Sequence, residues 1–227
     1  RQIEEVLKEG ETLGFDGRVV SVGEGEGYAA IAGKKNAKVN YQVDLIDEIW
    51  EDRPVLSEEP AFNLDVKYAG ETVASKLARI REEMKEAGTN VHVVSTIDDI
   101  CWTLNIRGND IDFFPLVLSY GIITMDSFEL YIDEKKLDDK LKAKLAKDGV
   151  NLHPYNDIYE DVKKFGSDVV AMIDPGKLNY ALFNNIPENV KTVEKRNPAI
   201  LMKAIKNPVE IENIRKAQIK DSVAHVR

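Results

Sequence analysis

The chain has 227 residues, which is enough for one large or two small domains with a substantial core. Its 40 acidic and 31 basic residues give a formal net charge of −9, and there is no basic cluster for a nucleic-acid backbone, so we expect no nucleic-acid partner. No apolar run approaches the ~20 residues of a membrane helix, so we expect no membrane partner. The one cysteine, Cys101, cannot form an internal disulfide, and we expect it to be a buried, reduced thiol.

The first 66 residues are expected to form short elements and then a boundary. The predicted elements are the end of a helix at 3–7, strands at 11–15 and 38–43, and short helices at 28–33 and 45–50. The prolines of Arg53-Pro54 and Glu59-Pro60 then interrupt regular structure. We therefore place a domain boundary in the acidic, proline-containing run 51–66.

One segment, Gly23-Glu24-Gly25-Glu26-Gly27, imitates a phosphate-binding loop. A dinucleotide fingerprint needs the spacing G-x-G-x-x-G, with backbone amides free to face a pyrophosphate. Here the spacing is G-x-G-x-G, and two glutamates would repel the anion. We interpret the segment as a flexible turn that binds no nucleotide.

The clearest helix is predicted over residues 72–87. Its apolar positions recur at helical spacing and form one stripe, made of Val73, Leu77, Ile80, Met84 and Ala87. Gly88 follows at the position where a glycine commonly ends a helix. We expect the stripe to pack in the core.

The remaining elements alternate between strands and helices. Residues 91–94 read as a buried strand, and Thr96 with Asp99 has the spacing of a capping box for a following short helix. Further elements are strands at 116–124, 128–132, 150–152, 169–173 and 192–193, helices at 137–145, 158–165 and 177–184, and a last helix from Pro208. This order predicts an α/β domain with a mixed sheet.

No catalytic or metal-binding set can be assembled from the titratable residues. His92, His153 and His225 are scattered, and none has a second histidine or a carboxylate at ligand spacing. Asp98 and Asp99 are adjacent on a helix and point about 100° apart, so capping explains them better than acid–base chemistry.

Several short motifs occur in one order along the chain and carry a family resemblance. They are LDVKYAG at 64–70, Asp98-Asp99-Ile100 with Trp102, LNIRGND at 104–110, Phe114-Pro115 with 118–120, and KAIKNPVE at 203–210, with GFDG at 14–17 and DLIDEIWEDRP at 44–54 extending the match. With them the chain resembles the three-domain Xaa-Pro aminopeptidases (aminopeptidase P) of the creatinase/prolidase, or pita-bread, superfamily. The resemblance implies an α/β fold like the creatinase/prolidase N-terminal domain, a mixed β-sheet flanked by helices.

The resemblance also implies how the chain is divided. Residues 1–64 correspond to the C-terminal part of a first creatinase-N-like domain, and residues 65–205 to a second. Residues 206–227 correspond to the first helix of the catalytic pita-bread domain. We expect the remainder of that domain to be missing here.

The family removes the N-terminal residue that precedes proline in a peptide, using two divalent metals, usually manganese, to activate a bridging water. Its ligands are two Asp, one His and two Glu in the catalytic domain, and none has a matching position in this sequence. We therefore expect no catalytic, cofactor-binding or metal residue here, no activity from this chain alone, and a scaffold role that shapes access to the site. The implied partners are peptides with proline second, the protein's own catalytic domain and, for the full-length protein, a second copy in a homodimer, all in the cytoplasm.

The remaining candidate is the polar loop that matches the family's Asn-x-Arg-Gly-x-Asp run, namely Asn105, Arg107, Gly108 and Asp110. In one interpretation the loop faces the catalytic domain or the mouth of its cleft. In the other, which we favour, Arg107 and Asp110 pair to brace a tight loop and Gly108 supplies a positive φ.

One rival function stays open, and two positions depart from the family pattern. The rival is a non-catalytic, peptidase-like binding or chaperone module, as in histone chaperones that reuse the pita-bread fold. Asp112-Phe113-Phe114 replaces a more polar version of the loop, and Gln218 stands where many members carry a histidine. The family's contacts at those side chains are therefore not carried over to this chain.

Overall fold

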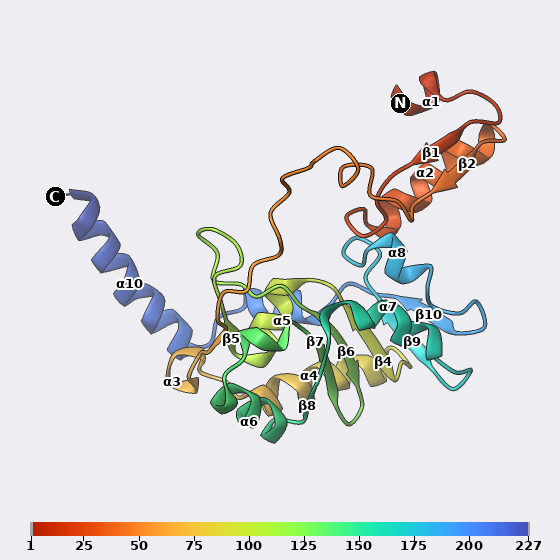
Figure 1. The fold of residues 1–227 in the computed structure, drawn as a ribbon. Coiled ribbons are helices and arrows are strands. Elements are labelled where there is room, and N and C mark those ends of the chain that lie inside the picture. The colour runs from red at the N-terminus through yellow and green to blue at the C-terminus, as the bar shows by residue number, and fades with distance from the viewer. Residues whose placement is uncertain (1, 227) are drawn as a thin grey trace.

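The computed structural model describes residues 2–226, and a six-stranded mixed sheet lies at its centre (Figure 1). The strand order is β10-β9-β4-β6-β7-β8. The strands are β4 (Val91–Val94), β6 (Tyr120–Thr124), β7 (Phe128–Tyr131), β8 (Val150–His153), β9 (Val170–Ile173) and β10 (Lys191–Glu194). Strands β4, β9 and β10 are parallel, β6 runs antiparallel to β4 and to β7, and β8 is parallel to β7. The predicted α/β fold with a mixed sheet is confirmed.

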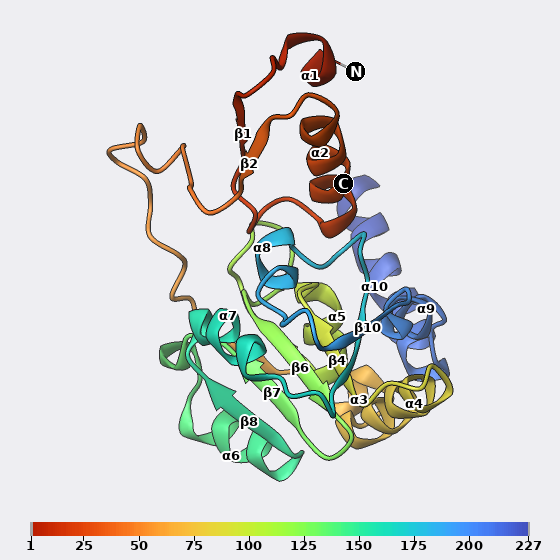
Figure 2. The ribbon, with the colours of Figure 1, turned by 90° about the vertical axis from the view of Figure 1, so that its right-hand side faces the viewer.

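Helices cover both faces of this sheet (Figure 2). One face carries α4 (Val73–Glu86), α5 (Ile97–Leu104), α6 (Asp139–Lys147) and α9 (Pro198–Ala204), whose buried side chains form one apolar cluster with alternate strand residues. The other face carries α7 (Ile158–Asp161) and α8 (Tyr180–Phe183) and forms a second cluster. Because side chains alternate across a strand, β4 supplies Val94 to the first cluster and Val91 and Val93 to the second.

The helix predicted over residues 72–87 is α4, and its limits have the expected physical causes. The Thr72 side chain accepts a hydrogen bond from the Ser75 amide, and Gly88 follows the helix with a φ of 68°. Leu77, Ile80 and Met84 are no more than 1% exposed. The predicted stripe therefore packs in the core.

Several predicted elements differ in extent; the helix predicted at 28–33, for example, begins earlier, at Val22. The strand predicted at 116–124 is β6, which begins only at Tyr120, and the helix predicted at 177–184 is the shorter α8, Tyr180–Phe183. The helix predicted at 158–165 is α7 followed by the 3₁₀ turn η3 (Val162–Lys164), and further 3₁₀ turns are η1 (Glu134–Lys136) and η2 (Tyr155–Asp157). The strand predicted at 38–43 ends earlier, at Asn40.

The N-terminal part contains α1 (Gln2–Val6), β1 (Thr12–Gly14), α2 (Val22–Lys34) and β2 (Lys38–Asn40), with β1 and β2 parallel. The predicted flexible turn at Gly23–Gly27 is wrong, because these glycines lie inside α2. The cause is a capping box: the Ser21 hydroxyl accepts the Glu24 amide, and the Glu24 carboxylate accepts the Ser21 amide. Gly25 permits close packing, since a Cβ there would come within 2.2 Å of Tyr180 Cδ2.

The short helix predicted at 45–50 is also wrong, because residues 45–49 form turns. Asp44 accepts the amides of Ile46 and Asp47 and binds the Arg53 guanidinium at 2.6 Å, which holds the segment in a tight turn. Six residues before a proline give too few helical hydrogen bonds to offset nucleation. The chain then continues as an extended linker over residues 53–61 (Figure 1).

The linker leads into β3 (Phe62–Asn63) and α3 (Val66–Ala69), and β3 pairs antiparallel with β5 (Ile106–Arg107). The last helix, α10 (Pro208–Val226), packs mainly on α3 and otherwise extends away from the body (Figure 1). Its start is fixed where the Asn207 amide group donates to the Ala69 carbonyl at 2.8 Å. Within the described part of the chain, none of the helices is both long and apolar enough to cross a bilayer.

Candidate functional site

The candidate loop follows α5 and contains β5, and beyond Gly108 it projects from the body between the linker and α10 (Figure 1). The four residues that the sequence singled out do not come together as one site. Asn105 and Arg107 face α5 and α4, whereas Asp110 faces η1. Each is described in turn below.

Asn105 ends α5 in the left-handed conformation, with a φ of 52°. The Lys76 ammonium donates to Asn105 Oδ1 and to the Trp102 carbonyl, both at 2.7 Å, and lies 4.3 Å from the Trp102 ring centroid. Asn105 in turn donates to the Glu71 carbonyl at 2.9 Å. Burial lowers the pKa of Lys76 to about 8, although the nearby Glu210 and Glu71 carboxylates raise it.

Arg107 braces the loop, but with a different partner from the predicted one. Its Nη1 donates to the Cys101 carbonyl of α5 at 2.9 Å and to the Ile106 carbonyl of β5 at 2.8 Å, which ties the end of the helix to the strand that follows. Burial lowers the pKa of this guanidinium. The predicted Arg107–Asp110 pair is wrong, because Asp110 binds another cation.

Asp110 forms a buried ion pair with Lys136, which the sequence pattern did not reveal because the two lie 26 residues apart. The Lys136 ammonium lies 2.6 Å from Asp110 Oδ2, and the two side chains are 2% and 1% exposed. The same carboxylate oxygen accepts the Leu118 amide at 2.7 Å. Asp110 Oδ1 is buried and has no partner among the described residues.

Gly108 does not supply a positive φ, so that prediction is wrong as well. Glycine is required at position 108 because a Cβ there would come within 2.6 Å of Val117 Cγ2. Beyond Gly108 the loop does contain a left-handed residue, Phe113, with a φ of 67°, which is uncommon for a bulky side chain. Phe113 is fully exposed, and Phe114 is 62% exposed.

The two aspartates of α5, Asp98 and Asp99, bind the neighbouring helix α9. Thr96 begins α5 without capping a backbone amide, so the predicted capping box does not form. Its hydroxyl instead donates to Asp99 Oδ2 at 2.7 Å, and this oxygen also accepts the Asn197 amide group at 2.9 Å. The Lys203 ammonium of α9 binds Asp98 and Asp99 together. The pair is therefore structural.

Three further groups that could carry chemistry are held in structural roles. The ring nitrogens of buried His92 lie 3.1 Å from the Met172 carbonyl and 3.2 Å from Asn197 Oδ1, and burial lowers the pKa of this imidazole. His153 binds Glu129 at 2.6 Å. Cys101 is buried, as predicted, and burial raises the pKa of its thiol to about 11. Over residues 2–226, no three His, Cys, Asp or Glu side chains are grouped as a metal ion would require.

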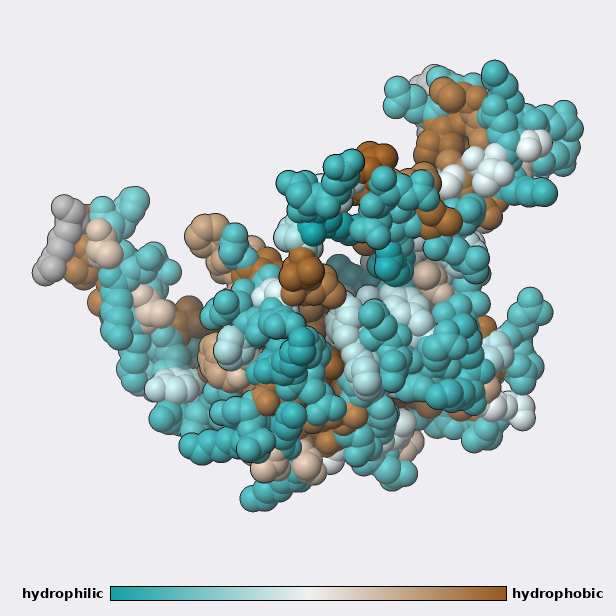
Figure 3. Space-filling view, viewed as in Figure 1, coloured by the Kyte–Doolittle hydropathy of each residue, from teal (hydrophilic) through white to brown (hydrophobic). Residues whose placement is uncertain are grey.

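The loop therefore has an inner and an outer part. The inner polar side chains are anchored to α4, α5 and η1, as described above. The outer tip carries Ile111, Phe113 and Phe114, which are exposed, and Figure 3 shows apolar surface where the loop projects. A loop whose inner residues are anchored and whose tip is apolar is suited to contacting another protein surface rather than to proton transfer.

The sequence of this chain is similar to those of a known family and of several known proteins. The sequence profile of the Creatinase/Prolidase N-terminal domain family matches residues 52–210. The Probable Xaa-Pro aminopeptidase P of Sordaria macrospora is 34% identical over 237 residues, which is 96% of this chain and 38% of the relative. The Xaa-Pro aminopeptidase 1 of Dictyostelium discoideum is 36% identical over 227 residues, 95% of this chain and 35% of the relative.

A solved structure agrees with the sequence comparison. The crystal structure of the X-prolyl aminopeptidase from Caenorhabditis elegans, a cytosolic enzyme with a di-nuclear active site, superposes with a TM-score of 0.93 at 30% identity. It is matched over 99% of this chain and 37% of that one, so this chain spans less than two fifths of the proteins it resembles. These matches confirm the resemblance drawn from the sequence motifs: the chain belongs to the Creatinase/Prolidase N-terminal domain family.

Proposed function

We propose that this chain forms the non-catalytic N-terminal region of a metal-dependent Xaa-Pro aminopeptidase, which removes the N-terminal residue preceding proline. The observation that carries the proposal is the match of 99% of the chain to 37% of the C. elegans enzyme. In this proposal residues 1–64 belong to a first creatinase-N-like domain, 65–205 form a second, and 206–227 begin the catalytic domain. The family match over residues 52–210 supports the second of these assignments.

The region acts as a scaffold that shapes access to a site it does not contain. The two metals, which we take to be manganese, are bound by the catalytic domain, since the described residues of this chain offer no group of ligands for them. The C. elegans relative has a di-nuclear site and is cytosolic, which supports two metals and a cytoplasmic location here. The substrates are peptides with proline second, and the full-length protein forms a homodimer.

The tip of the candidate loop is the part of the scaffold that faces the catalytic domain. Three observations support this. The inner part of the loop is anchored through Arg107, and Phe113 at the tip is exposed in a left-handed conformation. The Glu210 carboxylate of α10 raises the pKa values of both Lys76 and Arg107, against the larger effect of burial. Glu210 lies in the first turn of α10. The loop and the start of the proposed catalytic domain are therefore electrostatic neighbours.

A hybrid enzyme tests the proposal. The part of the C. elegans enzyme that matches this chain is replaced by the 227 residues, and the release of the first amino acid from a tripeptide with proline second is measured with manganese. We expect the hybrid to turn over, because the scaffold has the same fold, and we expect the 227 residues alone to release nothing above buffer. A hybrid that folds and binds metal but shows no turnover would favour the non-catalytic binding module instead.

Two variants of the hybrid isolate the loop tip. Replacing Phe113 and Phe114 by serine is expected to change KM for a nonapeptide with proline second by at least threefold, while kcat/KM for the tripeptide changes less than twofold. The matched control is Phe62→Ser, an exposed phenylalanine at 48% on β3 outside the loop. Equal effects of the loop and control variants on both substrates would exclude a role of the tip in access.

A further inference from the structure

A groove runs where the extended linker crosses the body of the protein. It consists of two adjoining cavities of about 520 and 470 Å³, which share Leu56, Tyr155 and Asn156 in their walls. The linker provides one wall and η2 the other. We call these two cavities the linker groove, and each has the size of a typical ligand site.

A row of tyrosines lines one half of the linker groove. The ring centroids of Tyr120 and Tyr155 lie 5.0 Å apart, and those of Tyr120 and Tyr159 lie 5.9 Å apart. The hydroxyls of Tyr120 and Tyr159 are 3.1 Å apart, and the Asn179 amide group donates to Tyr159 at 3.1 Å, so the rings are held in place. Fixed aromatic ledges of this kind bind the rings of extended, proline-containing segments.

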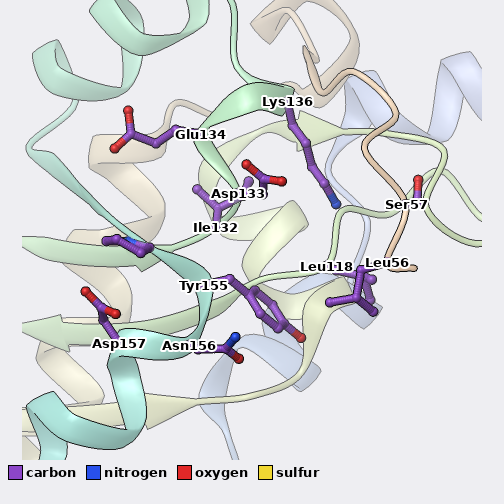
Figure 4. Close-up of a pocket in the computed structure, with 11 residues that line it drawn as sticks. Leu56, Ser57, Leu118, Ile132, Asp133, Glu134, Lys136, Tyr155, Asn156 and Asp157 are labelled. Carbon is purple, nitrogen blue, oxygen red and sulfur yellow. The ribbon is translucent and has the colours of Figure 1, made fainter. Parts of the chain in front are cut away.

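The other half of the linker groove is acidic. Figure 4 shows Asp133, Glu134 and Asp157 among the residues that line this cavity, with the Tyr155 ring pointing toward Leu118 and Leu56. Among the described residues of its wall, the one cation is Lys136, which is already paired with buried Asp110. The Asp157 carboxylate makes no hydrogen bond or ion pair with any described residue, and Glu134 binds Lys142, whose side chain is 35% exposed. A cationic side chain entering here would meet three carboxylates, of which Asp133 and Asp157 also interact electrostatically with Lys135 and Lys164.

The linker wall offers free backbone groups as well. Val55 is 91% exposed, and the amides and carbonyls of Val55 and Leu56 make no backbone hydrogen bond to another described residue. Exposed extended backbone can pair with a second extended chain. Figure 3 shows the linker's apolar side chains at the surface over this region.

From these features we propose that the linker groove is a peptide-binding site. Its ligand is an extended, proline-containing peptide whose prolines pack on the tyrosine row and whose Lys or Arg side chain enters the acidic half. The peptide class rests on the proposed function, whereas the groove and its charge are features of this chain. In a longer enzyme such a site would raise the local concentration of these peptides.

Fluorescence anisotropy on the 227-residue chain tests the proposal. The probe is acetyl-Lys-Pro-Pro-Pro-Pro-Ala with fluorescein at its C-terminus, and the acetyl group removes the free N-terminus that an aminopeptidase requires. We expect saturable binding with a Kd below about 1 mM and at least fivefold weaker binding when norleucine replaces lysine. A probe with glycine in place of the prolines should bind at least fivefold more weakly as well. Because no turnover is measured, the outcome is independent of the catalytic assignment.

Protein variants locate the binding on the chain. Glu134→Gln with Asp157→Asn should reduce the preference for lysine over norleucine to less than twofold, and Tyr155→Ala should weaken both probes. The control Asp126→Asn, on the exposed turn between β6 and β7, should change neither. Lack of saturation, equal binding of the lysine and norleucine probes to the unaltered protein, or an unchanged preference in the acidic double variant would each overturn the proposal.

Discussion

Lys76 should make the stability of the protein depend on pH. It is 1% exposed, and its pKa is lowered from 10.5 to about 8, so the folded state holds its proton less tightly than the unfolded state does. Between these two values the unfolded state binds more protons, and the free energy of unfolding therefore rises with pH. Well below pH 8 both states are protonated and the contribution is constant.

The size of this effect follows from the shift. With pKa values of about 8 and 10.5, the free energy of unfolding should increase by about 2 kcal/mol from pH 7.5 to pH 9.5 through Lys76 alone. The range stops at pH 9.5 because burial raises the pKa values of Tyr120, Tyr131 and Tyr155, whose ionisation would lower stability above that range. Other lysines titrate too, so a difference measurement is needed.

Urea unfolding of the protein and of Lys76→Met at pH 7.5, 8.5 and 9.5 provides that difference. Methionine keeps the apolar stem of the side chain but cannot titrate. The stability of the unaltered protein minus that of the variant should rise by about 2 kcal/mol over the range. A difference that stays constant within about 0.5 kcal/mol would refute the argument that burial controls this lysine.

Three further substitutions test the contacts of the candidate loop and of α2. Arg107→Ala should lower the free energy of unfolding by about 1–2 kcal/mol in urea unfolding, because the Cys101 carbonyl of α5 and the Ile106 carbonyl of β5 lose a donor. Lys136→Met should cost about 3–5 kcal/mol by leaving buried Asp110 unpaired, and Lys136→Met combined with Asp110→Asn should recover at least half of that loss. Gly25→Ala should cost about 1–3 kcal/mol and lower the Tm in a thermal melt, since the new methyl group would overlap the Tyr180 ring.

Each substitution has a matched control in the same chain. Arg79→Ala removes an exposed ion pair with Glu71 and should lower the free energy of unfolding by less than about 1 kcal/mol. If Arg107→Ala lowered it by no more than that, Arg107 would not brace the loop. Gly27→Ala lies in the same helix with nothing within 4 Å of the new Cβ, and it should be neutral or stabilising. For the ion pair, a double variant as unstable as the single one would show that the loss is due to packing rather than to an unpaired charge.

Local patterns in the sequence were enough to predict much of the fold. The stripe of α4, its threonine cap and the glycine after it are determined within 17 residues, and the run of β4, apolar except for His92, marks a strand buried on both faces. At Gly23–Gly27 two local signals conflicted. The glycines favour a turn, whereas Ser21 and Glu24 form a capping box that begins a helix, and tertiary packing against Tyr180 favoured the helix.

The candidate loop shows why contacts were harder to predict than elements. The sequence identified Arg107, Gly108 and Asp110 as a structured unit, but it paired the two charges with each other because they were the nearest in sequence. The actual partner of Asp110 is Lys136, which η1 brings back against the loop, and Gly108 is small because Val117 packs against it. Both facts depend on long-range packing that no local spacing encodes.

The attachment of α10 makes it a lever arm. The helix has 19 residues, and its root is held by Asn207, which contacts Ala69 and leaves no room for a side chain at Gly70. At 1.5 Å per residue the arm is about 28 Å long, so a rotation of about 10° at the root displaces its far end by about 5 Å. The joint at Asn207 and Gly70 thus sets the angle at which the arm leaves the sheet domain.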